Sequence, residues 1–178
     1  MRRMLPVLFA LSISSAIGAA GNLRHVVTAR AALATDAAHP ASSAKAVVVA
    51  EIAEGFHIND QKPTLEYLIP TELKLAAADG VNVANVVYPR GEPKKFAFSE
   101  NPLSVYEGAL KVGVLLKIAR TAKPGTRTLK GELKYQACND HACLPPTSVP
   151  VTLAVKVVPR GTLLKRINTE LFDSVQFK

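Results

Sequence analysis

The chain has 178 residues, of which 48% are hydrophobic and 20% charged, and its formal net charge is +8. This length suits a single domain that can bury a moderate core. The basic residues are scattered and lack the interleaved aromatic side chains of a nucleic-acid platform, so the composition argues against nucleic acid as a partner.

The N-terminal segment has the three parts of a secretory signal peptide. Arg2 and Arg3 precede an apolar run over residues 5–17, and small residues follow at positions 18–20. The run is interrupted by serines and is shorter than the ~20 residues that a membrane-spanning helix needs. We therefore predict a signal peptide over residues 1–20 and an exported protein that is not embedded in a membrane.

Residues 21–44 are rich in alanine and small polar residues and lack a sustained periodicity. This texture predicts a flexible Ala-rich tether, with a short helix around residues 27–33 as the alternative.

From residue 45 onward, short runs that alternate apolar and polar residues predict β-strands. The clearest run buries one face through Leu110, Val112, Val114, Leu116 and Ile118. A second run over residues 127–137 would bury Leu129, Leu133 and Tyr135. Because a Pro124-Gly125 turn separates these two runs, we expect them to form a hairpin. Other predicted strands lie at residues 46–53, 56–58, 71–77, 81–88 and 147–158.

About seven short strands without a strong amphipathic helix predict an all-β fold, an immunoglobulin-like antiparallel β-sandwich over residues 45–160. The alternation stops in residues 161–178, which we predict to be a C-terminal tail. A short helix there would have an apolar side made of Leu163, Leu164, Ile167 and Leu171.

Both cysteines of the chain lie in the stretch "YQACNDHACLPP" (135–146), with four residues between Cys138 and Cys143. A hairpin connection can bring their Cα atoms to the ~5.5 Å that a disulfide needs, and an oxidising compartment lets that bond persist. As a structural clamp the bond would contribute only about 2 kcal/mol, because the ring is short.

Two other roles for the cysteines stay open. A metal site would use Cys138, His141 and Cys143, with Asp140 as a fourth donor, although structural zinc sites usually have two ligand pairs. A redox pair needs a thiolate and a resolving partner; a protonated His141 would favour the thiolate, and Asp140 would oppose it. The spacing and the β context differ from the helical C-x-x-C of thioredoxins. His57 is expected in the core or on the surface rather than as a ligand.

The cysteine stretch, with "GFHINDQKPTLEYLIPTELKL" (55–75) and "SENPLSVYEGALKVGVLLKI" (99–118), resembles the N-terminal periplasmic domain of the thiol:disulfide interchange protein DsbD. The resemblance covers roughly residues 45–160. The Tyr-Gln before the first cysteine and the Pro-Pro after the second carry most of it. Better-known members of the family have one residue more between the cysteines.

The resemblance implies that Cys138 and Cys143 exchange electrons without a cofactor or a metal, and that Cys138 forms the mixed disulfide. It also implies a cap loop, for which Phe96 and Phe98 are candidates, with Tyr135 and His141 as further residues around the loop; core packing is the alternative for both phenylalanines. The implied partners are thioredoxin-fold proteins, as donor and as acceptors, and a separate membrane electron transporter.

The alternative function is a non-redox protein-binding β-sandwich. In that case the disulfide only clamps a loop that presents His141, Pro145 and Pro146 to a partner.

Overall fold

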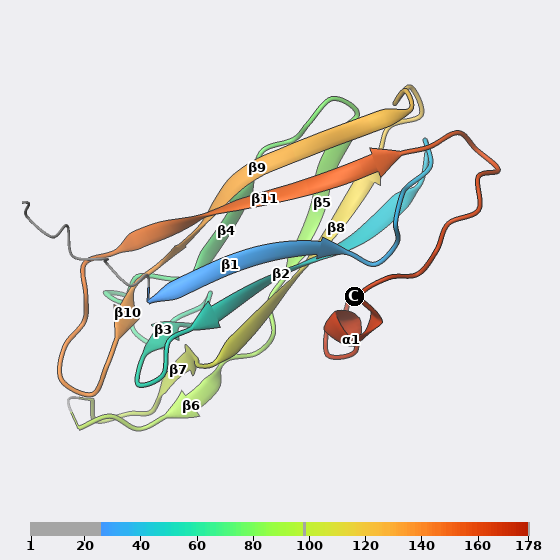
Figure 1. The fold of residues 1–178 in the computed structure, drawn as a ribbon. Helices are drawn as coiled ribbons and strands as arrows, with labels where there is room; N and C mark the ends of the chain where they lie inside the picture. Colours follow the sequence, from blue (N-terminus) through green and yellow to red (C-terminus); the bar gives the residue numbers. More distant parts are fainter. Residues whose placement is uncertain (1–25, 98, 178) are drawn as a thin grey trace, which may run out of the picture.

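A computed structural model describes residues 26–97 and 99–177, and almost all of its regular structure is β-strand (Figure 1). The predicted signal peptide over residues 1–20 lies outside the described residues. In chain order the elements are β1 (Val27–Leu33), β2 (Ser43–Ile52), β3 (His57–Asn59), β4 (Glu72–Leu75), β5 (Val81–Val87), β6 (Glu92–Lys94), β7 (Leu103–Tyr106), β8 (Ala109–Ile118), β9 (Gly125–Tyr135), β10 (Ala137–Cys138), β11 (Thr147–Val157) and α1 (Thr169–Phe172).

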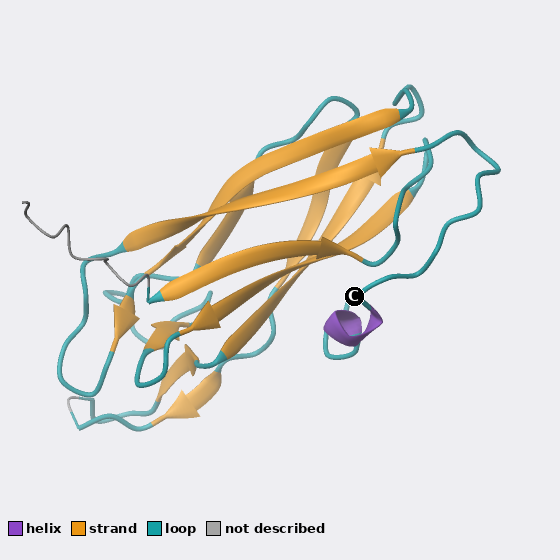
Figure 2. Cartoon of the chain, viewed as in Figure 1, coloured by secondary structure: helices purple, strands orange, loops and turns teal. Residues whose placement is uncertain are grey.

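Two sheets form the sandwich, and a third extends it at one end (Figure 2). The order β1-β2-β8-β5 makes one layer and β11-β9-β4 the other, while β10-β3-β7-β6 forms the extension. All strand pairs within these sheets are antiparallel. The predicted all-β, immunoglobulin-like sandwich is therefore confirmed.

The core lies between the two layers and is built by the strands with the strictest alternation. The residues predicted to face inward from β8, β9 and β11 are all buried: Leu110, Val112, Val114, Leu116, Ile118, Leu129, Leu133, Tyr135, Val149, Val151, Leu153, Val155 and Val157. Since each fully buried Val or Leu side chain contributes about 1.5–3 kcal/mol, these strands supply much of the burial that holds the layers together.

The predicted hairpin between residues 110–118 and 127–137 is wrong. β8 pairs with β2 and β5, whereas β9 pairs with β4 and β11. The chain crosses from one layer to the other through the connection at residues 119–124, so the apolar faces of β8 and β9 meet across the core. A period-two pattern shows that each strand has a buried face but does not say which strand lies beside it.

The predicted tether over residues 21–44 is also wrong for its described part. Residues 27–33 form β1, an edge strand that pairs with β2 over its full length. Residues 34–38 then cross to the other layer, where Ala38 makes a parallel bridge with Val157. The alanines at alternate positions of β1 differ too little in hydrophobicity from the polar residues between them, so the alternation was not recognised.

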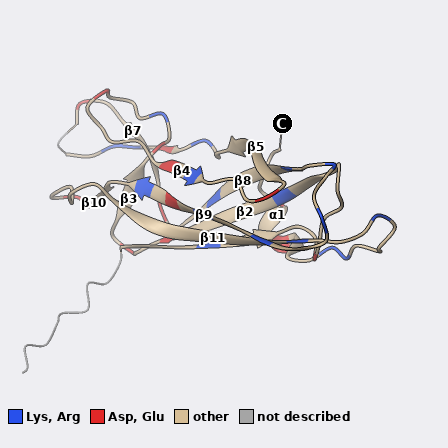
Figure 3. Cartoon of the chain, turned by 90° about the horizontal axis from the view of Figure 1, so that it is seen from above, with Lys and Arg blue, Asp and Glu red and all other residues tan. Residues whose placement is uncertain are grey.

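The C-terminal segment, residues 159–177, runs along the outer side of the β1-β2-β8-β5 sheet (Figure 1). Its helix is limited to Thr169–Phe172 and contains Leu171 but not Leu163, Leu164 or Ile167, and Leu163 is 86% exposed, so the predicted apolar helix side is wrong. Lys, Arg, Asp and Glu positions are distributed over the strands and loops (Figure 3).

Candidate functional site

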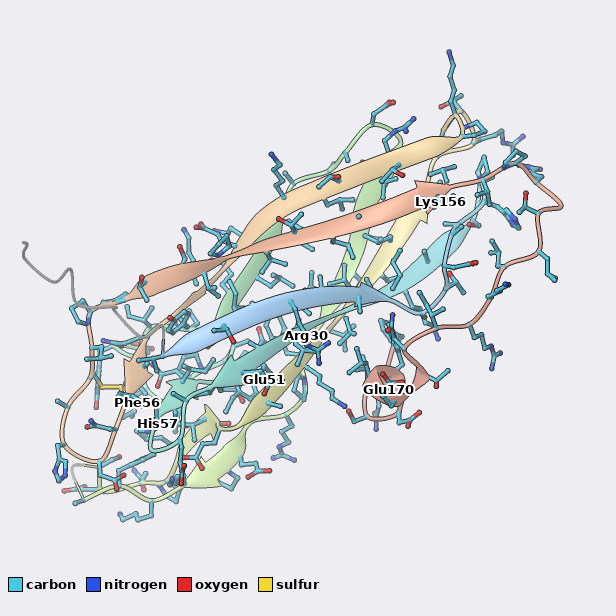
Figure 4. All side chains as sticks on the ribbon, in the orientation of Figure 1. Arg30, Glu51, Phe56, His57, Lys156 and Glu170 are labelled. Carbon is cyan, nitrogen blue, oxygen red and sulfur yellow. A yellow bond between two sulfur atoms is a disulfide. The ribbon has the colours of Figure 1, made fainter. Side chains whose placement is uncertain are left out.

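Cys138 and Cys143 form a disulfide at the end of the sandwich where the extension sheet lies (Figure 4). The Leu144 N–H donates to the Ala137 carbonyl at 2.8 Å, and the Asn139 N–H donates to the Ala142 carbonyl at 3.0 Å. The two cysteines face each other between these bonds, as a non-hydrogen-bonded antiparallel pair, for which Cα atoms come closest. Their Cα atoms lie 4.0 Å apart, nearer than the typical disulfide separation expected from the sequence.

The side chain of Asn139 also holds the loop between the cysteines. Its Oδ1 accepts hydrogen bonds from the backbone N–H groups of His141 and Ala142, both at 2.9 Å. This is an Asx turn, in which a side-chain carbonyl takes the place of a backbone acceptor. The hairpin therefore has hydrogen bonds of its own in addition to the bond between the sulfurs.

The two cysteines differ in exposure. Cys138 is only 2% exposed, because β10 packs beside β3, whereas Cys143 lies on the exposed side of the hairpin. His141, Leu144, Pro145 and Pro146 are exposed as well.

β10 pairs with β3 in a register that sets Cys138 opposite His57 and Ala137 opposite Ile58. Residues directly opposite in an antiparallel pair have their side chains on the same face. Ala137 and Ile58 belong to the main core, so Cys138 and His57 share the other face of this pair. His57 is 2% exposed, and Figure 4 shows it close to the disulfide.

Phe96 packs against His57, the residue opposite Cys138 in the β3–β10 pair. Its ring stacks on the His57 ring, with centroids 4.3 Å apart and planes inclined by 30°. It is also buried in a small second cluster with Leu103 and Val105, against which Leu65 and Leu68 pack. Phe96 is thus packed in an apolar cluster, as the core-packing alternative expects, and its role as a cap stays a prediction.

The other residues predicted to lie around the cysteine loop do not gather at one place in the structure. Phe98 lies outside the described residues. Tyr135 is buried in the main core, and burial raises the pKa of its hydroxyl, while a hydrogen bond with the backbone of Val27 acts in the opposite direction. His141 is exposed at the tip of the hairpin. Of these residues, Phe96 is therefore the one that the structure brings next to the cysteine face.

Charged groups line a cavity next to His57. A cavity of about 420 Å³ is lined by this ring together with Glu54, Lys94, Glu107 and Asp140. Lys94 forms an ion pair with Glu107, and its Nζ lies 5.7 Å from the centroid of the Phe96 ring. Burial lowers the pKa of His57 below its ordinary value of 6.5, and Lys94 lowers it further, whereas Glu107 and Asp140 raise it.

Sequence reasoning missed the place of His57 in this site. It lies far from the cysteines in the chain, and only the pairing of β3 with β10 brings it opposite Cys138. An isolated "FHI" strand carries no signal for that pairing.

The described residues contain no group of three or more His, Cys, Asp or Glu side chains arranged to hold a metal ion. None of their helices has the length and apolar character needed to cross a membrane.

Comparisons with known proteins give one family. The family model described as "Thiol:disulfide interchange protein DsbD, N-terminal" matches residues 24–154. No match was found among curated proteins.

Solved structures with similar folds are distant in sequence. The N-terminal periplasmic domain of ScsB from Proteus mirabilis is 16% identical with a TM-score of 0.46, and the match covers 71% of this chain but only 44% of that one. The seventh ScaB type I cohesin from Pseudobacteroides cellulosolvens is 13% identical with a TM-score of 0.46, covering 78% and 97%. The Neisseria meningitidis complex of the DsbD and PilB N-terminal domains gives 20% identity and a TM-score of 0.40, covering 68% and 80%.

Proposed function

This chain belongs to the family of N-terminal domains of the thiol:disulfide interchange protein DsbD, and we propose on that basis that it carries electrons between thioredoxin-fold proteins through Cys138 and Cys143. Family membership and the disulfide together support thiol–disulfide exchange in general. The direction of transfer, the partners and the role of each sulfur are our proposal.

The single observation that carries the proposal is the difference in exposure between the two cysteines. A thiolate from another protein must approach one sulfur of the disulfide in line with the bond. Cys143 lies on the exposed side of the hairpin, whereas Cys138 is 2% exposed. We therefore assign the mixed disulfide to Cys143, in place of the assignment to Cys138 that the family resemblance implied.

In the proposed exchange, the disulfide is reduced in two steps. A donor thiolate attacks the Cys143 sulfur, the intramolecular bond breaks, and Cys138 leaves as a thiolate that takes up a proton. A second donor thiolate then attacks the donor sulfur of the mixed disulfide, which frees Cys143 and leaves the donor oxidised. The reduced domain passes both electrons to a client disulfide by the reverse sequence, with Cys143 attacking and Cys138 resolving.

The hairpin is suited to opening and closing this bond. Its backbone hydrogen bonds and the Asn139 turn hold Cys138 opposite Cys143 by contacts that do not involve the sulfurs. The reduced pair therefore keeps the geometry from which the disulfide re-forms. A disulfide needed only as a clamp would sit where other contacts are lacking.

We further propose that the domain works in the periplasm after export, with reducing equivalents supplied by a separate membrane electron transporter. The signal-peptide pattern of residues 1–20 and the family membership support this location.

A trapping experiment tests the exchange. Each single-cysteine variant is first treated with dithiobis(nitrobenzoate), so that its cysteine carries a thionitrobenzoate group, and is then mixed with a reduced bacterial thioredoxin whose resolving cysteine is replaced by serine. We expect Cys138→Ser to accumulate a mixed disulfide, because the thioredoxin thiolate attacks the reachable Cys143 sulfur, thionitrobenzoate leaves, and nothing resolves the adduct. Cys143→Ser should accumulate far less, since Cys138 is buried. Non-reducing electrophoresis and mass spectrometry measure both adducts.

The opposite results would count against the proposal in different ways. Preferential trapping by Cys143→Ser would overturn the assignment of Cys143. If neither variant is trapped, the wild-type disulfide stays oxidised against reduced thioredoxin, and the double serine variant still binds its partner, the non-redox binding module is the better description.

A further inference from the structure

The burial of Cys138 creates a chemical difficulty for the proposed exchange. Only a thiolate attacks a disulfide bond, and burial in apolar surroundings favours the neutral thiol, which is unreactive. Cys138 is 2% exposed, and the His57 ring opposite it in the β3–β10 pair stacks on Phe96. When Cys138 has to resolve a mixed disulfide on Cys143, it needs a nearby group that takes its proton.

His57 is placed to be that group. It lies directly opposite Cys138 in the β3–β10 pair, with its side chain on the same face. Side chains opposite each other in such a pair have Cβ atoms about 4.5–5.5 Å apart, a separation that thiol and imidazole can bridge. The stacked Phe96 ring, 4.3 Å away between centroids, fixes the imidazole on this face.

We propose that His57 accepts the proton of the Cys138 thiol and thereby activates it as the resolving nucleophile. The inference rests on the proposed function and adds the residue that makes its second cysteine reactive. Cys138 gives its proton to a ring nitrogen of His57, and the resulting thiolate attacks the Cys143 sulfur. The bond between Cys143 and the client breaks, and the client leaves as a thiolate. The imidazolium returns the proton to that thiolate or to solvent.

The surroundings of His57 fit a proton acceptor. Burial keeps its pKa low, so the ring is neutral and able to accept a proton at neutral pH. The charged groups that face it are Lys94 on β6, Glu107 after β7, and Asp140 in the cysteine hairpin. The cavity they line includes the exposed residues Glu54 and Gly55, which gives the proton a route to solvent.

An aromatic disulfide reagent separates the two chemical steps. The reduced domain releases one equivalent of coloured thiol from dithiobis(nitrobenzoate) when Cys143 attacks, and a second equivalent when Cys138 resolves the adduct. We expect His57→Phe to slow the second phase on the order of tenfold to a hundredfold at neutral pH. The pH dependence of that phase should also move to higher pH, because the buried thiol must then ionise without a base.

The first phase should be unchanged in His57→Phe, because Cys143 does not depend on His57. His57→Gln, which cannot accept the proton as a base, should slow the second phase in the same way. The matched control is His39→Gln, since His39 lies away from the cysteines and contacts the Thr162 carbonyl. Far-ultraviolet circular dichroism and thermal unfolding establish that each variant is folded.

The possible outcomes separate a failure of this inference from a failure of the proposed function. If wild type shows both phases and the two folded His57 variants resolve at the same rate with the same pH profile, His57 is not the acceptor and exchange by the cysteine pair stands. If the wild-type protein is not reduced by thioredoxin and is not trapped, the proposed function itself fails.

Discussion

At the scale of single residues, Asp60 ties together three segments next to the extension sheet. Its carboxylate accepts hydrogen bonds from the Lys62 N–H, the Tyr106 hydroxyl, the Gly91 N–H and the Ser104 hydroxyl, at 3.0, 2.9, 3.0 and 2.7 Å respectively. Gly91 has no room for a side chain, because a Cβ there would lie 2.4 Å from Asp60 Oδ2. The carboxylate thus holds Gly91, just before β6, next to Ser104 and Tyr106 of β7.

Asp60 also makes the stability of the domain depend on acid. Burial acts to raise its pKa, but the hydrogen bonds from Ser104, Lys62, Tyr106 and Gly91 outweigh it and lower the pKa below the ordinary value of 3.8. The unfolded chain therefore binds the proton more readily than the folded one. The contribution of Asp60 is fully present above pH ~3.8 and is lost as the pH falls through the folded pKa.

We expect Asp60→Asn to lower the free energy of unfolding by about 2 kcal/mol at neutral pH, because an amide loses the charge and turns one acceptor into a donor that faces other donors. The loss should shrink as the pH falls below ~3.8. Urea unfolding at several pH values measures both effects. The control is Glu66→Gln, an exposed carboxylate in the neighbouring loop. A pH-independent loss would show that the charge of Asp60 is not what stabilises the fold.

At the scale of strands, the predictions from sequence were most reliable for strands in which apolar and polar residues strictly alternate. The buried faces of β8, β9 and β11 follow from their alternation, residue by residue. β1 was missed because alanine hides the contrast between its faces, and β6 and β7 because a strand of three or four residues is too short to show a period. The hairpin prediction failed because alternation carries no information about the neighbouring strand.

Gly131 shows how closely two strands approach in the β11-β9-β4 sheet. It pairs with Leu75 of β4, and a Cβ at Gly131 would lie 1.9 Å from the Lys74 carbonyl oxygen and 2.8 Å from the Leu75 Cα. These are backbone atoms, which cannot move aside without displacing β4. The glycine is therefore needed for the pairing of β4 with β9.

We expect Gly131→Ala to destabilise the fold by about 1–3 kcal/mol or more, since overpacking of this kind forces a backbone shift. Hydrogen exchange of the β4 amides should increase with it. Gly113→Ala is the matched control: a Cβ there would meet the side-chain ends of Val175, at 2.6 Å, and Phe177, at 3.1 Å, which can move. Equal losses in the two variants would contradict a backbone clash at Gly131.

At the scale of the whole molecule, the C-terminal segment explains why β2 is buried on both faces. Val47 and Val49 point away from the core, yet they are 0% and 1% exposed. Their partners on β8 are Gly113 and Lys111, and the C-terminal segment lies over both through Val175, Phe177 and the Glu170 carbonyl. Three hydrogen bonds attach it to the sandwich: the Asp36 N–H donates to the Lys165 carbonyl, the Lys165 N–H donates to Asp36 Oδ1, and the Ile167 N–H donates to the Ala34 carbonyl.

Ending the chain at Gly161 should therefore lower the free energy of unfolding by about 3–6 kcal/mol, the transfer energy of two buried valine side chains at about 1.5–3 kcal/mol each. The rate of thiol–disulfide exchange should stay the same, because the disulfide lies toward the opposite end of the sandwich from the C-terminal segment (Figure 4). Denaturant unfolding and the two-phase thiol assay measure these quantities. Leu163→Ala, at a position that is 86% exposed, is the control for the segment. A changed exchange rate in the shortened chain would show that the two ends are coupled.

The sequence by itself determined the class of fold, the inward faces of the long strands and the pairing of Cys138 with Cys143, because each of these depends on residues close together in the chain. Only the tertiary structure decided which cysteine is exposed, that His57 lies opposite the buried one, and that the Phe96 ring stacks on His57. Those features arise where β3, β10 and the Phe96 loop meet. Contacts between segments tens of residues apart depend on strand pairing, which a local pattern does not encode.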